Sequence, residues 1–168
     1  MKKMNLKKQV FAAMLVCMGY VLSTFVSFPR MAPFQHMINV IAAVFLGPVG
    51  SFLTALVIGI MRMILNGRSI LAVIGGVVGA LLAGLMYRKF KTPIAAVIGE
   101  VIGTGILSAI LAFPVMKIFY GLPDTSIFTY VPFFIPASFM GAMMGYLLIK
   151  VLEKSKLLHK YQTMLQEN

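Results

Sequence analysis

The chain has 168 residues, of which 60% are hydrophobic and 11% are charged, and its mean hydropathy is +0.96. A soluble domain of this length could not bury so much apolar surface, so these values predict an integral membrane protein. The net charge of +11 does not favour nucleic-acid binding, because the basic residues flank apolar runs and do not cover a folded, water-exposed face.

The first predicted span covers about residues 9–28. The lysines before it resemble the start of a signal peptide, but the apolar run from Val10 contains no small-x-small cleavage site, so we expect a retained span. Cys17, the single cysteine, lies inside this run. It excludes a disulfide framework and a thiolate metal cluster, and we interpret it as a small packing residue.

The second predicted span, at about residues 36–46, is unusually short. Its eleven residues of helix rise only about 17 Å, whereas the hydrocarbon core is about 30 Å thick. The preceding loop, residues 28–36, contains Pro29 and Pro33, which argue against a continuous helix. The second span therefore either begins within this loop or crosses only part of the bilayer.

Turn signals separate the remaining spans. Glycine, proline, asparagine and basic residues mark turns at residues 47–50, 66–69 and 87–91. The spans between and after them are predicted at about 51–65, 70–86, 93–113 and 127–151. Pro93 suits the first turn of a helix, and residues 114–126 are predicted to be a loop with room for a short interfacial helix.

The distribution of Lys and Arg predicts the orientation. With six spans, the N-terminus, the loop at 88–91 and the C-terminal tail lie on one side and hold eleven of the fifteen basic residues. The positive-inside rule then places both termini in the cytoplasm. If the second span were not a crossing, the loop at 88–91 and the tail would lie opposite the N-terminus. We therefore predict one all-α transmembrane domain, residues 1–168, folded as a six-helix bundle.

Small residues recur at i, i+4 spacing in the later spans. The pairs are Gly75/Gly79, Ala80/Gly84, Gly99/Gly103 and Gly141/Gly145. This spacing allows close backbone approach in lipid, so spans four, five and six are expected to pack tightly on one another, with or without any functional role.

Two charged residues lie inside spans, where each costs at least about 2.5 kcal/mol near the centre and should face the protein interior. Arg62 shares a helix face with Asn66 one turn later, and Glu100 is one turn before Thr104. Arg62 and Glu100 could form a structural ion pair. Alternatively, Arg62 and Asn66 could donate hydrogen bonds into an outward-facing pocket whose floor is Glu100.

Further polar and aromatic residues are expected at the outer ends of the spans. His36 and Asn39 are three residues apart, just after the proline-containing loop, and could be structural groups or ligand contacts. Tyr130 and Phe133 could belong to an interfacial aromatic belt or could offer a face to a flat heteroaromatic ligand. No nucleotide-binding loop, zinc-protease motif or nucleophile–base combination is present. We therefore predict no enzyme, no cofactor and no metal site.

Three segments of the chain are similar to one known family: PFQHMINV at 33–40, GIMRMILNGRS at 59–69 and GEVIGTGI at 99–106. The chain resembles the ThiW type of substrate-binding (S) component of energy-coupling factor (ECF) vitamin transporters. The resemblance implies six helices in a bacterial cell membrane and an outward pocket capped by the short proline-rich loop after the first helix. It also implies uptake of the thiamin precursor hydroxyethylthiazole, with ATP hydrolysed by partner subunits.

The same resemblance implies partners: a transmembrane coupling protein and two cytoplasmic ATPases, with the S component toppling in the membrane to deliver its ligand. S components dock through Ala-x-x-x-Ala on the first helix, and the nearest match here is Ala13 with Cys17. A neutral thiazole alcohol needs an apolar or aromatic slot and a few hydrogen-bonding groups, so neutralisation of Arg62 by Glu100 would suit it. The expected substrate-binding residues are His36, Asn39, Arg62, Asn66, Glu100, Thr104, Tyr130 and Phe133.

Two alternatives remain open. The chain could be an S component for another small vitamin, or a small self-sufficient channel or exporter. A channel predicts an oligomer with a continuous polar path, whereas a binding subunit predicts one closed pocket at the outer side.

Overall fold

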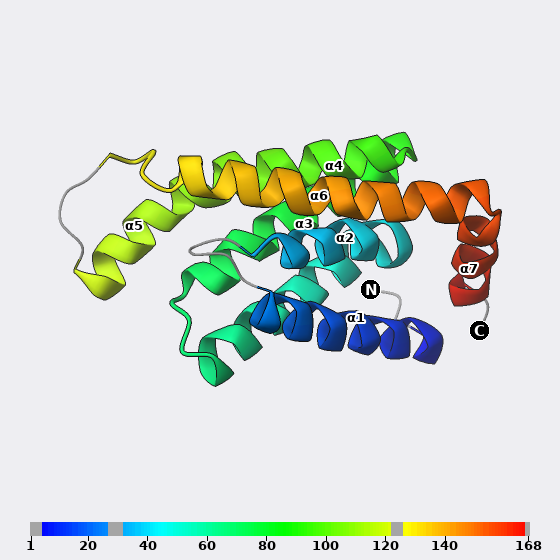
Figure 1. Ribbon diagram of the computed structural model, residues 1–168, viewed down its shortest axis with the longest axis horizontal. Helices are drawn as coiled ribbons and strands as arrows, with labels where there is room; N and C mark the ends of the chain where they lie inside the picture. The colour runs from blue at the N-terminus through cyan, green and yellow to red at the C-terminus, as the bar shows by residue number, and fades with distance from the viewer. Residues whose placement is uncertain (1–4, 27–31, 122–125, 167–168) are drawn as a thin grey trace.

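A computed structural model describes residues 5–26, 32–121 and 126–166, and the regular structure within these ranges is entirely helical (Figure 1). The elements are α1 (Leu6–Phe25), α2 (Pro33–Leu65), α3 (Leu71–Phe90), α4 (Pro93–Ile102), the π-helical segment η1 (Gly103–Ser108), α5 (Ala109–Tyr120), α6 (Val131–Lys154) and α7 (Leu157–Gln166). Five stretches of the described chain are long and apolar enough to cross a membrane: α1, α2, α3, the continuous α4–η1–α5 segment and α6.

Helix α2 doubles back on itself at Gly47, within the predicted turn. Gly47 has φ 72° and ψ −172°, which only glycine adopts readily, and Pro48 follows it. Arg62 donates a hydrogen bond to Gln35, although 27 residues of straight helix would separate them by about 40 Å. The first arm of α2 (residues 33–46) and its second arm (residues 48–65) are thus antiparallel (Figure 1).

The short first arm of α2 lies inside the bundle. Ile38, Val40, Ala42 and Ala43 on this arm are all 0% exposed. Because protein surrounds it, this arm does not need the length of a lipid-exposed span. The arm also begins at Pro33, earlier than expected, since proline suits the first helical turn. The expected capping loop lies mostly at 27–31, outside the described residues.

Two helix ends differ from the prediction. The fifth span does not stop at Phe113 but continues through Pro114 to Tyr120, and ends at Gly121 with φ 59°. Proline is tolerated within membrane helices, where neighbouring groups satisfy the freed backbone, so Pro114 does not end this helix. The sixth span begins at Val131, after a turn at 127–130.

Helix α7 was not predicted. It is short and amphipathic, and it packs Leu158 and Leu165 against the end of the bundle. Gln162 on α7 donates to the carbonyl of Val44 at 3.1 Å and to the hydroxyl of Tyr87 at 3.0 Å, and so joins α7 to α2 and α3.

Small residues bring α3 and α4–η1 into close contact, as predicted for spans four and five. A methyl group at Gly99 would lie 2.7 Å from Ala83 Cα, and one at Gly103 would lie 2.7 Å from Gly79 Cα. The glycines of span six behave differently, because Gly141 and Gly145 pack on the first arm of α2 and not on spans four and five. This arm occupies the centre of the bundle, which the glycine pattern alone could not show.

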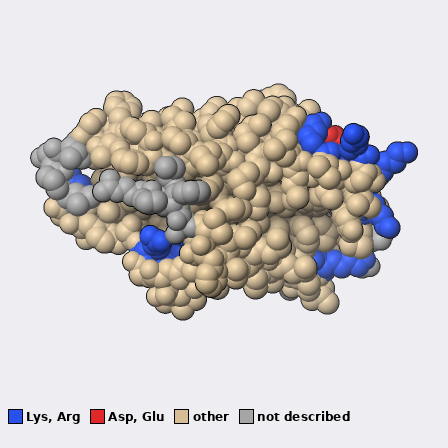
Figure 2. Space-filling view, viewed as in Figure 1, with Lys and Arg blue, Asp and Glu red and all other residues tan. Residues whose placement is uncertain are grey.

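Basic residues gather at one end of the molecule. On the face drawn in Figure 2, Lys and Arg cluster where α1 begins and where α6 meets α7. The end of α1, the start of α2, the connection between α2 and α3, and the start of α6 lie at the opposite end. The two ends of the bundle therefore differ in charge as the count of basic residues predicted.

Candidate functional site

A cavity of about 560 Å³ opens at the end of the bundle away from the lysine cluster. It lies between the start of α2, the α2–α3 connection, η1 and the start of α6. Of the predicted residues, His36, Arg62, Thr104, Tyr130 and Phe133 line it. The remaining predicted residues lie either beneath the cavity or away from it, as follows.

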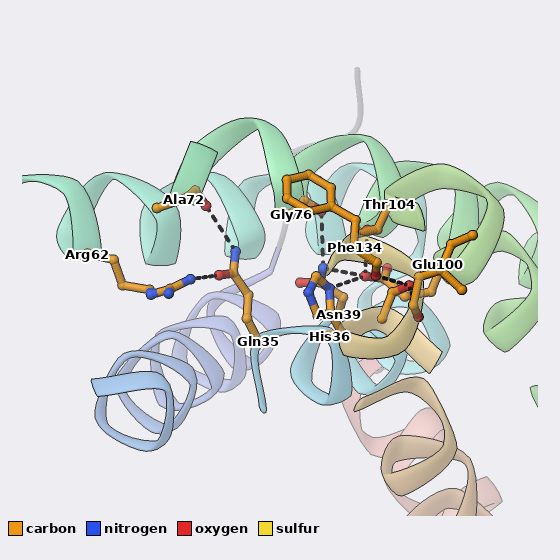
Figure 3. Close-up of polar contacts among 11 residues, drawn as sticks. Gln35, His36, Asn39, Arg62, Ala72, Gly76, Glu100, Thr104 and Phe134 are labelled. Atoms are coloured by element: carbon orange, nitrogen blue, oxygen red, sulfur yellow. Dashed lines mark hydrogen bonds and ion pairs between the residues drawn. The ribbon is translucent and has the colours of Figure 1, made fainter. Parts of the chain in front are cut away.

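Glu100 forms the centre of a buried polar network beneath the cavity (Figure 3). It is 0% exposed, and its Oε1 accepts from Asn39 Nδ2 at 3.0 Å and from Thr104 Oγ1 at 3.0 Å, and lies 2.8 Å from His36 Nδ1. Asn39 also donates to the carbonyl of Gly76 at 3.1 Å. The first arm of α2 and η1 thus supply three partners to Oε1 of a carboxylate on α4, and these offset part of the cost of burying the acid. Its Oε2 is buried and has no hydrogen-bond partner among the described residues.

Two glycines of α3 make room for this network. A methyl group at Gly79 would collide with Thr104 Oγ1 and lie 2.9 Å from Glu100 Oε2. A methyl group at Gly76 would collide with Gln35 Nε2. The i, i+4 glycine pattern on α3 therefore shapes the site as well as the helix contact.

Arg62 is buried, at 8% exposure, but it does not pair with Glu100. Its Nη1 donates to Gln35 Oε1, while Gln35 Nε2 lies 3.4 Å from the carbonyl of Ala72. Within the described chain the imidazole of His36, and not Arg62, contacts Glu100, with Nδ1 2.8 Å from Oε1. The expected neutralisation of Arg62 by Glu100 is therefore wrong. The physical reason is that the first arm of α2 places Gln35 and His36 between them (Figure 3).

Aromatic side chains of α6 and the preceding turn form one wall of the cavity. Tyr130, Phe133 and Phe134 all line it. The rings of Tyr130 and Phe134 are 6.1 Å apart between centroids and inclined at 50°, and the ring of Phe134 faces Gly75 of α3. Such a wall can stack against a flat ring.

Asn66 does not reach the cavity. It follows α2 as its C-cap residue, and its amide is directed to α1. Asn66 Oδ1 accepts from the Tyr20 hydroxyl at 2.8 Å, and Asn66 Nδ2 donates to Thr24 Oγ1 at 2.7 Å. The structure thus gives Asn66 a role in joining α1 to α2, because its side chain turns toward the neighbouring helix and away from the face of Arg62.

Several lining residues were not in the predicted set. They are Gln35, Arg68, Ser69, Thr129 and Phe134. Gln35 stands beside His36 in the first turn of α2, and recognising that Pro33 begins this helix would have placed both side chains at the same level. Arg68, Ser69 and Thr129 lie in turns or irregular segments, where periodicity carries no signal, and Phe134 lies in the first turn of α6.

Ala13 and Cys17, the expected docking pair, are both exposed on α1. The opposite face of α1 is the buried one, through Leu15, Gly19 and Ser23. The pair is therefore accessible on the outer surface of the described bundle, and its docking role stays a prediction.

The groups around the cavity are suited to recognition of a small molecule. They comprise an aromatic wall, a hydroxyl, an imidazole and guanidinium groups, above a carboxylate that already has three partners. No cluster of three His, Cys, Asp or Glu residues that could hold a metal ion occurs within 5–26, 32–121 and 126–166.

Comparisons with known proteins place this geometry in context. No curated protein matches the chain. A solved structure described as "Structure and mechanism of the S component of a bacterial ECF transporter" has a TM-score of 0.70 at 22% identity, over 88% of this chain and 96% of that chain. The chain therefore has the fold of an ECF S component, and it is a multi-pass membrane protein.

Family membership rests on a separate match. The profile of the family described as "Thiamine-precursor transporter protein (ThiW)" matches residues 9–155, which is most of the chain. This family consists of transporters and not of enzymes. The chain belongs to the ThiW family of thiamine-precursor transporter proteins.

Proposed function

We propose that this protein is the substrate-binding S component of an ECF-type importer, and that it binds the thiamin precursor hydroxyethylthiazole in the cavity for ATP-driven uptake. The observation that carries the proposal is the cavity itself. One wall is aromatic, the buried carboxylate of Glu100 lies beneath the cavity and contacts the lining residues His36 and Thr104, and the opening is at the end of the bundle away from the lysines. This arrangement suits a flat ring with a single polar arm.

The available hydrogen-bonding groups support binding of a hydroxyl. His36 Nδ1 is used by Glu100, whereas Nε2 makes no hydrogen bond within the described part of the chain. A neutral His36 that donates from Nδ1 has Nε2 as an acceptor for a ligand hydroxyl. Thr104 Oγ1 donates to Glu100 and keeps a lone pair for the same purpose. The thiazole ring then lies against Tyr130 and Phe134, where stacking adds to burial.

Energy for transport comes, in this proposal, from a coupling protein and two cytoplasmic ATPases. The exposed face of α1 that carries Ala13 and Cys17 is the proposed docking surface. The basic end of the bundle faces the cytoplasm with both termini, so the cavity opens outward in a bacterial cell membrane.

Calorimetric titration of the detergent-purified protein with hydroxyethylthiazole tests the proposal. We expect saturable one-to-one binding, and His36→Ala is expected to lower the affinity about tenfold, the effect of losing a hydrogen bond worth about 1.4 kcal/mol. His159→Ala is the matched control, since His159 is exposed on α7 far from the cavity, and it should leave the affinity unchanged.

Two outcomes would contradict the proposal. Binding of another small vitamin in the absence of thiazole binding would keep the S-component assignment but change the ligand. Ion or solute flux through liposomes containing this chain alone, without ligand binding, would favour a self-sufficient channel or exporter.

A further inference from the structure

Arg62 is a cation in the cavity wall, and among the described residues no carboxylate contacts it. It is 8% exposed, and the only hydrogen-bond partner of its guanidinium within the described chain is the neutral amide of Gln35. Its Nε is buried and has no hydrogen-bond partner among the described residues. A buried guanidinium is costly unless it is paired, and Glu100, which could have paired with it, is already bound by His36, Asn39 and Thr104.

The cavity lining shares this excess of positive charge. Arg62 and Arg68 both line it, and the charge of Arg68 acts unfavourably on that of Arg62. No Asp or Glu occurs among the described lining residues. A neutral thiazole alcohol does not account for the buried cation of Arg62 at this position, because it offers that guanidinium no counter-charge.

The geometry of Arg62 matches an oxyanion. Nη1 is occupied by Gln35, which leaves Nε and Nη2 along the other edge of the planar group. Two adjacent N–H donors of this kind bind carboxylate or phosphate oxygens in a bidentate manner. Gln35, held between Arg62 and the carbonyl of Ala72, fixes the orientation of that edge.

The site therefore has two poles, which Figure 3 shows at opposite ends of the network. At one pole, Glu100, Thr104 and His36 lie close to the aromatic wall and can hold the ring. At the other, Arg62 lies beyond Gln35. The volume of about 560 Å³ falls in the range that holds drug-sized ligands, about 300–1,000 Å³, and leaves room for an arm longer than hydroxyethyl.

We propose that the preferred ligand carries an anionic group that binds Arg62, and that this ligand is the phosphate monoester of the thiazole alcohol. The inference rests on the proposed function, since it assumes that the ring occupies the same cavity. Esterification of the hydroxyl with phosphate extends the arm and adds a negative charge that can pair with the Arg62 guanidinium. A carboxylate on a similar arm shares the chemistry and is distinguished by experiment.

The test is competition binding to the full-length purified protein with four probes. These are hydroxyethylthiazole, its phosphate monoester, the corresponding thiazole acetic acid and inorganic phosphate. We expect the wild-type protein to bind the monoester at least about tenfold more tightly than the alcohol, as one charge-assisted bidentate contact permits. Higher salt should reduce this preference, although less than for an exposed pair.

Substitution of Arg62 supplies the decisive comparison. In Arg62→Met the preference for the monoester should disappear, while a circular dichroism spectrum and a thermal unfolding curve that match those of the wild type report an intact fold. Arg62→Lys keeps the charge but loses the two-nitrogen edge, and it should retain only part of the preference. Arg88→Met, at the exposed end of α3, removes the same charge far from the cavity. This variant should retain the full preference for the monoester.

The outcomes separate this inference from the proposed function. If the alcohol binds and the monoester binds no more tightly, or if Arg62→Met keeps the preference, the anionic ligand is wrong while the thiazole assignment stands. If the thiazole acetic acid binds more tightly than the monoester, the oxyanion site is supported and phosphate is the wrong anionic group. If inorganic phosphate competes as well as the monoester, the anion site is supported and the thiazole assignment fails. If no probe binds, both fail.

Discussion

Gly79→Ala is expected to disrupt the floor of the cavity, because Gly79 of α3 faces the Glu100–Thr104 pair directly. An added methyl group would collide with Thr104 Oγ1 and lie 2.9 Å from Glu100 Oε2 and 3.0 Å from Glu100 Cδ. Glu100 is 0% exposed and Thr104 is 1% exposed, so neither can move into solvent. Thr104 must therefore rotate away and lose its 3.0 Å hydrogen bond to Glu100.

The size of the effect follows from two costs. Overpacking a well-packed interior costs about 1–3 kcal/mol, and a hydrogen bond to a charged group contributes about 1.5–3 kcal/mol. The two costs overlap, because Thr104 relieves the collision by breaking this same hydrogen bond. We therefore expect the unfolding free energy to fall by about 2–4 kcal/mol, which is less than the sum of the two upper limits. Affinity for hydroxyethylthiazole should fall as well, by about tenfold if Thr104 contacts the hydroxyl.

Gly75→Ala is the matched control, one turn earlier on the same helix. There a methyl group would lie 3.4 Å from ring carbons of Phe134, which is close to ordinary contact, and alanine favours the helix by up to about 1 kcal/mol. Its stability should equal or exceed that of the wild type. The assay is denaturant unfolding of both variants in mixed micelles, followed by calorimetric titration with the ligand.

A double variant isolates the cause. Adding Thr104→Ala to Gly79→Ala removes the atom that collides, so the two changes together should cost less than the sum of the single changes. Equal stability of Gly79→Ala and Gly75→Ala, or strict additivity in the double variant, would refute the reasoning.

Three further predictions concern the network, the α1–α2 contact and the docking face. Glu100→Gln should lower stability by about 1.5–3 kcal/mol and weaken ligand binding, because the donors at Oε1 lose their charged acceptor; unchanged unfolding and titration curves would contradict this role. Asn66→Ala should lower the unfolding free energy by about 1–2 kcal/mol, because it removes two hydrogen bonds to α1. Ligand affinity should stay within about twofold, and a large loss of affinity would place Asn66 in the binding site. Cys17→Phe should leave binding by the purified protein intact but reduce uptake by cells that supply the coupling protein and ATPases; unimpaired uptake would argue against docking through this face.

Much of the bundle could be predicted because its signals are local. Apolar runs, Gly47–Pro48 and the distribution of lysines are each read from neighbouring residues, and they indicated six antiparallel passes. The continuation through Pro114 and the presence of α7 could not be read in this way. Both depend on tertiary contacts, such as the burial of Leu158 and Leu165 against the end of the bundle.

The site was predicted less completely, for a related reason. Intramembrane charge pointed to Arg62 and Glu100, and both are buried beside or beneath the cavity. Their partners depend on which helix lies between them, and no local pattern showed that the first arm of α2 inserts Gln35 and His36 there. The same insertion gives Arg62 an amide in place of Glu100 as its partner among the described residues.

A structure of the protein determined with hydroxyethylthiazole bound tests the central claim most directly. The account predicts the thiazole ring against Tyr130 and Phe134, with its hydroxyl within hydrogen-bond distance of His36 or Thr104, above an intact Glu100 network. A ligand bound elsewhere on the bundle, or a cavity filled by side chains while the ligand is bound, would contradict it.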